Sequence, residues 1–458
     1  MALPAQDDAL KGHWQRAACG FWLRYTQRGA DAGRITLMFI RLALDDRREL
    51  RRNLPEKMIP IAASSHSRRP RLVYILTVAR TGPLFLGGFV KDLCASGFDV
   101  SFVSSPGPGF ESITAEGAST YGVEMKREIT PVYDLLSLWR LWMLLRKIRP
   151  DITNVGTPKA GFLGGLAAVL AGVPYRIYTM HCLRLETTKG WKRRVLWCAE
   201  WLSCRCAHHV YCVSPSLREQ VIGLNLVDKA KTSVAANGTC NGIDSDRFAP
   251  TQERVGEALC LRAKLGIDPG AMVVGFVGRL TRDKGIPELY EAFSLLRARF
   301  PDLRLLLVGD YESGDAVPNN IRARLDADPT VVRIGWVADP APYYRVMDVL
   351  AMPSHREGIG LVSLEAQASR VPVVTTSATG ARDSVVSGIT GLCAPVGDAA
   401  ALADAIARLL QDSSLRGQMG DAARDWVVRM FDRRVLWSEL KERYVQVAHP
   451  GTVNLEHR

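Results

Sequence analysis

The sequence predicts an α/β protein with two successive doubly wound, Rossmann-like domains. Short apolar runs of the buried-strand type alternate with helix-period segments from residue 71 onward, and the same alternation starts again at residue 272. The connections between these segments are short, which is typical of parallel strands joined by crossover helices. A chain of 458 residues with 47% hydrophobic residues is large enough to bury two such cores.

The first series of elements begins at residue 71. We expect a buried-type strand at 72–78, a loop at 79–83, a helix at 85–95 and a second strand at 99–104. The glycines after the first strand do not form G-x-G-x-x-G, so no dinucleotide-binding fingerprint is predicted there. The later elements of this series are helices at 133–149, 160–171 and 191–206 and strands at 151–155, 173–180 and 209–213.

The helix expected at 133–149 carries an apolar stripe with helical spacing. Such a stripe is more often a core-facing side than a binding surface, and we interpret it as core. Its members are Leu135, Leu138, Trp139, Trp142, Leu145 and Ile148.

His181 directly follows the strand expected at 173–180. Ligands of doubly wound sheets bind just beyond the carboxyl ends of the strands, so His181 is a candidate functional residue. The alternative is a buried histidine with a structural role.

Six cysteines and histidines cluster in the sequence between residues 198 and 212. A zinc site would need closely paired ligands, and this group contains no C-x-x-C pair and straddles a helix end and a strand. We therefore predict core cysteines and no metal. The ten cysteines of the chain are scattered, which favours reduced thiols in a cytosolic protein.

The second series opens with a strand at 272–277 followed by the basic loop 278–285. This loop carries Arg279, Arg282 and Lys284 and leads into a helix that begins at residue 286. Cations beside a glycine loop and a helix N-terminus can hold a phosphate, although the P-loop pattern G-x-x-x-x-G-K-[ST] is absent. The alternative is a solvated basic turn.

Two carboxylates, Glu357 and Glu365, flank a glycine-containing bend between a strand at 346–352 and a helix at 361–369. If the segment were largely helical, eight residues would span about 12 Å. The paired carboxylates of glycosidases lie about 5–9.5 Å apart, so the spacing favours gripping two ends of an extended ligand. The other elements expected here are strands at 303–308, 331–334 and 371–376 and helices at 343–346, 399–410, 415–431 and 435–445.

Charge is distributed unevenly along the chain, whose formal net charge is +12. Residues 1–70 hold 13 Lys and Arg against 7 Asp and Glu. This segment is a solvated tail, upstream sequence included by a wrongly assigned start codon, or a basic surface helix that favours an anionic membrane. The chain has no apolar run of the roughly 18 residues needed to span a membrane and no secretory signal at its start.

In combination, these motifs resemble the GT-B glycosyltransferases of family 4 over nearly all of residues 71–445. The resemblance rests on Glu357-x7-Glu365 in the context P-S-x-x-E-G, on the loop 278–285 and on the Leu-Val-Gly-Asp run at 307–310. Further motifs, at 104–107, 157–160 and 178–181, are similar to the CapM-like subgroup, which builds capsule, exopolysaccharide and O-antigen repeat units.

The resemblance implies a role for each candidate residue. Arg279 and Lys284 would hold the donor diphosphate, Glu357 would face the transferred sugar and Glu365 would bind the ribose. The backbone of Gly358, Ile359, Gly360 and Leu361 would complete the anion site, and His181 would contact the donor sugar near the reacting carbon. The chain departs from the family pattern at Cys182, where glycine is usual, and at Gly360, the position associated with sugar selectivity.

The resemblance also implies a retaining, metal-independent hexosyl or N-acetylhexosaminyl transferase. Its donor would be a nucleotide-sugar, expected to be UDP-linked, and its acceptor a polyprenyl-diphosphate-linked saccharide. The expected location is the cytoplasmic face of the inner membrane, as a peripheral protein on the anionic surface. The implied domains are an N-terminal extension at 1–70, an acceptor-binding domain at 71–255 and a nucleotide-sugar domain at 256–425. Residues 426–458 would form a C-terminal helix that packs back on the first domain, and a tail.

Two alternatives remain beside this hypothesis. One is a glycosyltransferase with a soluble sugar or sugar-phosphate acceptor. The other is a nucleic-acid-binding protein, suggested only by the net charge, because the sequence contains no helix-turn-helix, zinc-finger or RNP-type motif.

Overall fold

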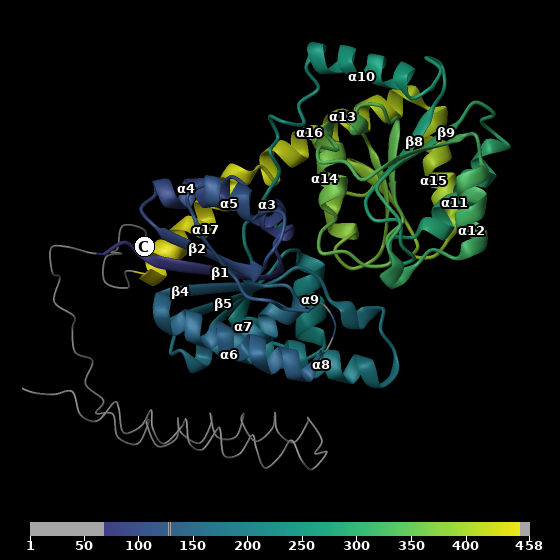
Figure 1. Ribbon diagram of the computed structural model, residues 1–458. Coiled ribbons are helices and arrows are strands. Elements are labelled where there is room, and N and C mark those ends of the chain that lie inside the picture. Colours follow the sequence, from purple (N-terminus) through teal and green to yellow (C-terminus); the bar gives the residue numbers. More distant parts are fainter. Residues whose placement is uncertain (1–67, 127, 129, 449–458) are drawn as a thin grey trace, which may run out of the picture. The chain divides into compact units, whose positions relative to one another are not determined.

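The computed structural model describes residues 68–126, 128 and 130–448. The expectations for residues 1–67 therefore lie outside the described residues. The described chain contains two parallel sheets, each with helices on both faces (Figure 1). We call the part built on the first sheet the first lobe and the part built on the second sheet the second lobe. This architecture confirms the predicted fold class.

The first lobe is organised around a seven-stranded sheet in the order β3-β2-β1-β4-β5-β6-β7. Every neighbouring pair is parallel, and β1 lies near the centre with Val73 opposite Ser101 of β2 on one side and Thr153 of β4 on the other. The central strands are buried because apolar helices cover both faces. The strands are β1 (Arg71–Val78), β2 (Asp99–Ser105), β3 (Ser119–Gly122), β4 (Ile152–Gly156), β5 (Tyr175–Met180), β6 (His209–Cys212) and β7 (Thr232–Val234).

Two apolar cores lie on the two faces of this sheet. On one face pack α6 (Pro131–Ile148), α7 (Pro158–Leu170), α8 (Gly190–Cys206) and α9 (Pro215–Gly223). On the other face pack α3 (Thr81–Leu86), α4 (Phe89–Ala95), α5 (Phe110–Ala115) and the last helix, α17 (Arg433–Ala448). Figure 1 shows α6, α7 and α8 together on one side of β1, β4 and β5.

The second lobe repeats this plan with six parallel strands in the order β10-β9-β8-β11-β12-β13. The strands are β8 (Val273–Val277), β9 (Arg304–Val308), β10 (Val331–Gly335), β11 (Val349–Met352), β12 (Val373–Thr376) and β13 (Gly391–Ala394). One core contains α11 (Ile286–Arg297), α12 (Asn319–Ala327) and α15 (Ala399–Gln411). The other contains α10 (Gln252–Lys264), α13 (Ala341–Tyr344), α14 (Leu361–Ala368) and α16 (Ser413–Met430).

The C-terminal helix α17 joins the core of the first lobe although it follows the second lobe in sequence. Leu436, Leu440 and Tyr444 are buried in the core beside β1. The Tyr444 hydroxyl lies 3.0 Å from the hydroxyl of Tyr74 and accepts a hydrogen bond of 2.9 Å from the Asn154 amide. The predicted boundaries at 255/256 and 425/426 fall inside α10 and α16.

The helix predicted at 85–95 is wrong in one respect, because two helices, α3 and α4, occupy residues 81–95. The break lies at Gly87 and Gly88. A Cβ on Gly87 would come within 2.3 Å of the Pro83 carbonyl oxygen, and Gly88 has a φ of 79° that favours glycine. The first strand is therefore followed by a short helix where a loop was expected.

The prediction that the stripe on α6 faces the core is wrong for two of its six members. Leu141 and Leu145 are buried, and Leu138, Trp142 and Ile148 pack against the same core. Leu135 and Trp139, in contrast, are exposed. They lie on the outward side of α6 because an apolar stripe wider than one helix face cannot be covered by the sheet alone. Among the described helices, none is long and apolar enough to cross a membrane.

Candidate active site

His181 lies just beyond the carboxyl end of β5, as its position in the sequence predicts. Its imidazole stacks on the ring of Phe85 from α3, with ring centroids 4.1 Å apart and an interplanar angle of 15°. A Cβ on Gly156, at the end of β4, would lie 2.8 Å from His181 Nε2, so glycine leaves the space that the ring occupies. Burial lowers the pKa of His181 to about 4, which keeps the ring uncharged at neutral pH.

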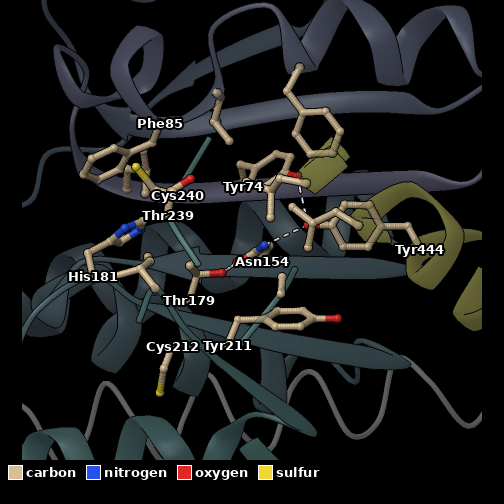
Figure 2. Close-up of a pocket in the computed structure, with 18 residues that line it drawn as sticks. Tyr74, Phe85, Asn154, Thr179, His181, Tyr211, Cys212, Thr239, Cys240 and Tyr444 are labelled. Atoms are coloured by element: carbon tan, nitrogen blue, oxygen red, sulfur yellow. Dashed lines mark hydrogen bonds between the residues drawn. The ribbon is translucent and has the colours of Figure 1, made fainter. Parts of the chain in front are cut away.

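A mostly apolar cavity begins at His181 and extends along the first sheet toward α17 (Figure 2). Its polar groups form a chain in which Thr179 donates to Asn154 Oδ1 (2.8 Å) and Asn154 donates to the Tyr444 hydroxyl. The cavity places a wall of aromatic and aliphatic side chains beside His181, from Tyr74, Phe85, Phe89, Tyr211, Leu436 and Leu440.

The basic loop after β8 lies against the loop after β11. Gly285 has a φ of 73°, and a Cβ there would come within 2.1 Å of the Pro353 carbonyl oxygen, so glycine permits this close approach. Lys284 Nζ lies 2.5 Å from Glu357 Oε1, and the same oxygen accepts a hydrogen bond of 2.7 Å from Ser354. The structure thus brings together Lys284 and Glu357, which were predicted separately.

Arg279 stands at the exposed end of the same loop. Its guanidinium donates to the Glu312 carboxylate, and Asp283 Oδ2 lies 4.0 Å from it. About half of the Arg279 side chain is exposed, so it can reorient toward an anionic ligand. Arg279 and Lys284 both hold carboxylate partners that a diphosphate can replace.

Glu365 lies on α14 and faces a different partner from Glu357. Its Oε2 accepts a hydrogen bond of 2.6 Å from the hydroxyl of Tyr344, which is itself fully buried. Burial raises the pKa of Glu365 to about 7, and the Tyr344 hydrogen bond opposes that rise. The segment is not helical throughout, because α14 begins only at Leu361. Glu357 and Glu365 therefore have different partners, Lys284 and Tyr344, and their roles toward a ligand stay a prediction.

Gly358 and Gly360 lie between the two carboxylates, and each position requires glycine for a different structural reason. Gly358 lies against the first lobe, since a Cβ on it would come within 2.1 Å of the His181 carbonyl oxygen. Gly360 is the N-cap of α14 with a φ of 73°, and a Cβ there would lie 2.7 Å from Met352 Cε. Ile359 is buried, so its side chain belongs to the core of the second lobe. The backbone of residues 358–360, rather than the Ile359 side chain, is therefore the part of this bend that can meet a ligand.

Arg356 joins the two lobes, a role the sequence motif did not suggest. Its Nη2 donates to Asp283 Oδ2 (2.8 Å) in the second lobe. Its Nε donates to Thr187 Oγ1 (3.1 Å), and its Nη1 lies 3.7 Å from the Cys182 sulfur in the first lobe. Cys182 therefore packs against a cation of the opposite lobe. Only the fold brings this loop to Arg356, so local sequence patterns contained no signal for it.

A second connection between the lobes lies at the start of α9. Ser216 donates from its backbone to Asp383 Oδ2 (2.9 Å), and its hydroxyl also donates to that oxygen (2.5 Å). The backbone N–H of Gly380 donates to Ser216 Oγ (2.7 Å). Gly380 in turn packs on the backbone of Glu357 and Gly358. No sequence motif pointed to Ser216 or Asp383.

The assembled site contains an uncharged histidine, three cations paired with carboxylates, and the N-terminus of an eight-residue helix. These groups match an extended anionic ligand, because cations and free backbone N–H groups stabilise phosphate oxygens. The ligand's uncharged part would face His181 and its other end would face Glu365.

Two families of known proteins match this chain, one over each lobe. Residues 84–238 match the family described as "Glycosyl transferase 4-like domain", and residues 271–412 match "Glycosyl transferases group 1". The capsular polysaccharide biosynthesis glycosyltransferase CapM of Staphylococcus aureus is 38% identical over 377 residues, which cover 82% of this chain and 97% of CapM. An Escherichia coli UDP-Gal:alpha-D-GlcNAc-diphosphoundecaprenol alpha-1,3-galactosyltransferase is 28% identical over 76% of this chain and 89% of its own length.

Solved structures share the fold at lower identity. Anabaena Alr3699/HepE, solved in complex with UDP-glucose, superposes with a TM-score of 0.70 over 81% of this chain and 98% of its own, at 21% identity. The family matches cover both lobes, including the elements that carry His181, Arg279, Lys284, Glu357 and Glu365. The chain belongs to the group 1, family 4 glycosyltransferases with the GT-B architecture.

Proposed function

We propose that this enzyme transfers a sugar from a UDP-linked donor to a polyprenyl-diphosphate-linked saccharide in the synthesis of a capsule, exopolysaccharide or O-antigen. The observation that carries the proposal is the meeting of His181 with the Gly358 backbone, beside Lys284 and Glu357. This contact brings the backbone of His181, whose ring is uncharged, against the glycine bend of the other lobe. The two relatives described above support the substrate classes, because their names specify capsular polysaccharide and a diphosphoundecaprenol acceptor.

In this mechanism the donor lies along the second lobe, which supplies all of its charged contacts. Arg279 and Lys284 hold the diphosphate, Glu365 accepts hydrogen bonds from the ribose hydroxyls, and Glu357 faces the hydroxyls of the transferred sugar. The bond between the sugar C1 and the phosphate oxygen breaks with its electron pair going to the diphosphate. The two cations compensate the charge that develops there. The acceptor hydroxyl bonds to C1, and its proton passes to the diphosphate oxygen that leaves.

His181 acts on the sugar as a neutral hydrogen-bonding group. Its pKa of about 4 keeps it uncharged at neutral pH. It therefore does not attract the diphosphate away from Arg279 and Lys284. The apolar cavity beside it lies in the lobe that would receive the acceptor. We expect retention of the anomeric configuration and activity without a metal ion.

A second candidate function is transfer to a soluble sugar-phosphate acceptor. D-inositol 3-phosphate glycosyltransferases, such as that of Corynebacterium urealyticum, are 37% identical over 190 residues. The match covers 40% of this chain and 44% of that protein. The match therefore shows that the two proteins are similar over less than half of each chain, and it does not indicate that they use the same acceptor.

The proposal is tested with purified enzyme, a panel of radiolabelled UDP- and GDP-sugars, and detergent-solubilised membrane lipids as acceptors. Label should enter the lipid fraction from a UDP-sugar, and the Lys284→Gln variant should abolish this transfer. Label found only in soluble products would overturn the lipid-linked acceptor. NMR of the product linkage tests retention, and assays with EDTA test metal independence.

A further inference from the structure

Helix α6 presents an apolar stripe to the outside of the first lobe. Val132, Leu135, Leu136, Trp139 and Met143 follow the spacing of a single helix face and are all exposed, Val132 by 81% and Trp139 by 54%. Three exposed cations flank the second half of this stripe, namely Arg140, Arg146 and Lys147. Large apolar side chains in such a row are not needed for the core, which uses the opposite side of the helix.

Helix α8 repeats the same arrangement. Trp191 is 69% exposed, and Val195 and Cys198 continue its stripe along the exposed side. The flanking cations, all exposed, are Lys192, Arg193, Arg194 and Arg205. Two helices of one lobe thus combine an outward apolar row with cations on its borders, which is the pattern of helices that lie in a membrane interface.

The helix between them is α7, which is mostly buried. Helix α7 packs against both α6 and α8, and its Leu170 is exposed. We call the outward side of α6, α7 and α8 the docking face. Figure 1 shows the three helices on the same side of the first sheet.

The charges of the docking face are almost entirely positive. The three helices contain eight Lys and Arg but only two carboxylates. Asp134 pairs with Lys159 at 2.7 Å, and Glu200 is buried and accepts a hydrogen bond of 2.7 Å from Tyr178. Both carboxylates are therefore engaged within the fold, and the remaining cations face outward.

The docking face ends at the edge of the sheet where His181 lies. In a parallel sheet with crossover helices, each helix starts near the carboxyl end of the preceding strand. Helix α7 begins two residues after β4, and α8 begins nine residues after His181. Val132 and Trp191 lie in the first turns of α6 and α8, so the apolar stripes start on the active-site edge.

We propose that the docking face binds an anionic lipid bilayer, with the apolar stripes inserted at the headgroup boundary and the flanking cations on lipid phosphates. A second copy of the chain fits this face poorly, because a symmetric contact would bring the cations of one copy against those of the other. Docking holds the active-site edge of the first lobe close to the headgroups. This proposal rests on the proposed function in one respect only, namely that docking would give the enzyme access to a lipid-linked acceptor.

The test is flotation of the full-length enzyme with phosphatidylcholine vesicles and with vesicles that also contain phosphatidylglycerol. The unmodified enzyme should float with the anionic vesicles. The double variant Leu136→Glu/Trp139→Glu should lose at least about tenfold in vesicle affinity, because charges would enter the apolar boundary. The matched control, Val255→Glu/Leu259→Glu, changes two residues of α10 that are 46% and 62% exposed and should float normally.

The flanking cations are tested separately by Arg140→Gln/Arg146→Gln/Lys147→Gln. A cation near an anionic surface contributes about 1 kcal/mol, or about fivefold, so three should change the affinity about a hundredfold. The control Lys264→Gln/Arg408→Gln/Arg429→Gln removes three exposed cations of the second lobe. If the glutamate variant melts early by circular dichroism, the cation variant carries the test, since its changes are all at exposed positions.

Several outcomes would overturn the docking face. They are absence of flotation by the unmodified enzyme, equal flotation of the variants and their controls, and a dimer in sedimentation that only Leu136→Glu/Trp139→Glu dissociates. Turnover is measured in parallel on a soluble acceptor analogue and on vesicle-borne acceptor. Loss of flotation with normal turnover on the analogue supports docking. Normal flotation without transfer to any lipid would instead count against the proposed acceptor.

Discussion

Lys284 and Glu357 form an ion pair, with Nζ 2.5 Å from Oε1, although 73 residues separate them in the sequence. The pair joins the loop after β8 to the loop after β11, at the carboxyl ends of two adjacent strands. Each partner thereby neutralises a charge that would otherwise be enclosed, since both side chains are largely buried. A donor that binds here must replace the carboxylate with its own phosphate oxygens, which makes the pair a direct test of the site.

Substitution of Lys284 by Gln should weaken UDP binding about 10- to 100-fold, the usual range for a lost hydrogen bond between charged groups. Isothermal titration calorimetry measures this change. The double variant Lys284→Gln/Glu357→Gln should bind UDP no worse than Lys284→Gln, because the carboxylate left without a partner is also removed. An unchanged UDP affinity in Lys284→Gln would show that Lys284 does not contact the diphosphate.

The pKa of Glu365, about 7, predicts that donor affinity depends on pH. Ribose hydroxyls donate hydrogen bonds to the ionised carboxylate, so affinity should rise as the pH increases through about 7, by up to about tenfold between pH 6 and pH 8. UDP-glucose is the appropriate ligand, because its diphosphate diester does not titrate in this range. Glu365→Gln should bind more weakly than the unmodified enzyme at about pH 8 and lose this pH dependence. A pH profile shared by both proteins would assign the titration to another group.

The buried Glu200 carboxyl should make the free energy of unfolding depend on pH, independently of catalysis. Burial raises its pKa from about 4.5 to about 7, so between these values the folded state retains a proton that the unfolded state releases. Stability therefore falls as the pH rises through this window. Glu200→Gln keeps an acceptor for Tyr178 and should be more stable at about pH 8, by on the order of 3 kcal/mol, with no difference below about pH 4.5.

Urea denaturation at several pH values measures this effect. Glu253→Gln, at an exposed position on α10, is the matched control and should leave stability unchanged. A stabilisation by Glu200→Gln that is the same at every pH would show that packing, rather than ionisation, is responsible.

Substitution of Gly358 by Ala should impair catalysis, because the added Cβ would collide with the backbone of the other lobe. An alanine Cβ would lie 2.1 Å from the His181 carbonyl oxygen, which is closer than a van der Waals contact. The two lobes must therefore move apart at this point to make room for it. A displacement of about 1 Å between reacting groups can cost about a hundredfold in rate, and we expect a comparable loss of kcat/KM for Gly358→Ala. Gly270→Ala, where a Cβ meets nothing within 4 Å, should retain full activity. Equal activity of the two variants would show that this contact is not formed during turnover.

The sequence predicted most of the regular elements because their signals are local. Buried parallel strands are short apolar runs, and the helices between them show a 3.6-residue period. The carboxyl ends of the strands carry the site in this fold, so His181, Arg279, Lys284 and Glu357 could be proposed from their positions alone. Glu365 was proposed from its spacing after Glu357.

Other features depend on which segments lie side by side. The break between α3 and α4 arises because the backbone at Gly87 closely approaches Pro83. The outward position of Leu135 and Trp139 arises because the first sheet covers only one side of α6. A hydrophobic pattern reports that a side chain is apolar, and not whether the fold covers it.

The sequence by itself determined two doubly wound domains and the family, and it proposed candidate donor-site residues, since each of these signals lies in a continuous stretch of chain. Only the tertiary structure decided how these residues are paired. Tyr344 meets Glu365, and Arg356 reaches Cys182 and Thr187, through contacts between segments far apart in sequence. Such contacts set hydrogen bonds, burial and pKa values, because these depend on the surroundings of a side chain rather than on its sequence neighbours.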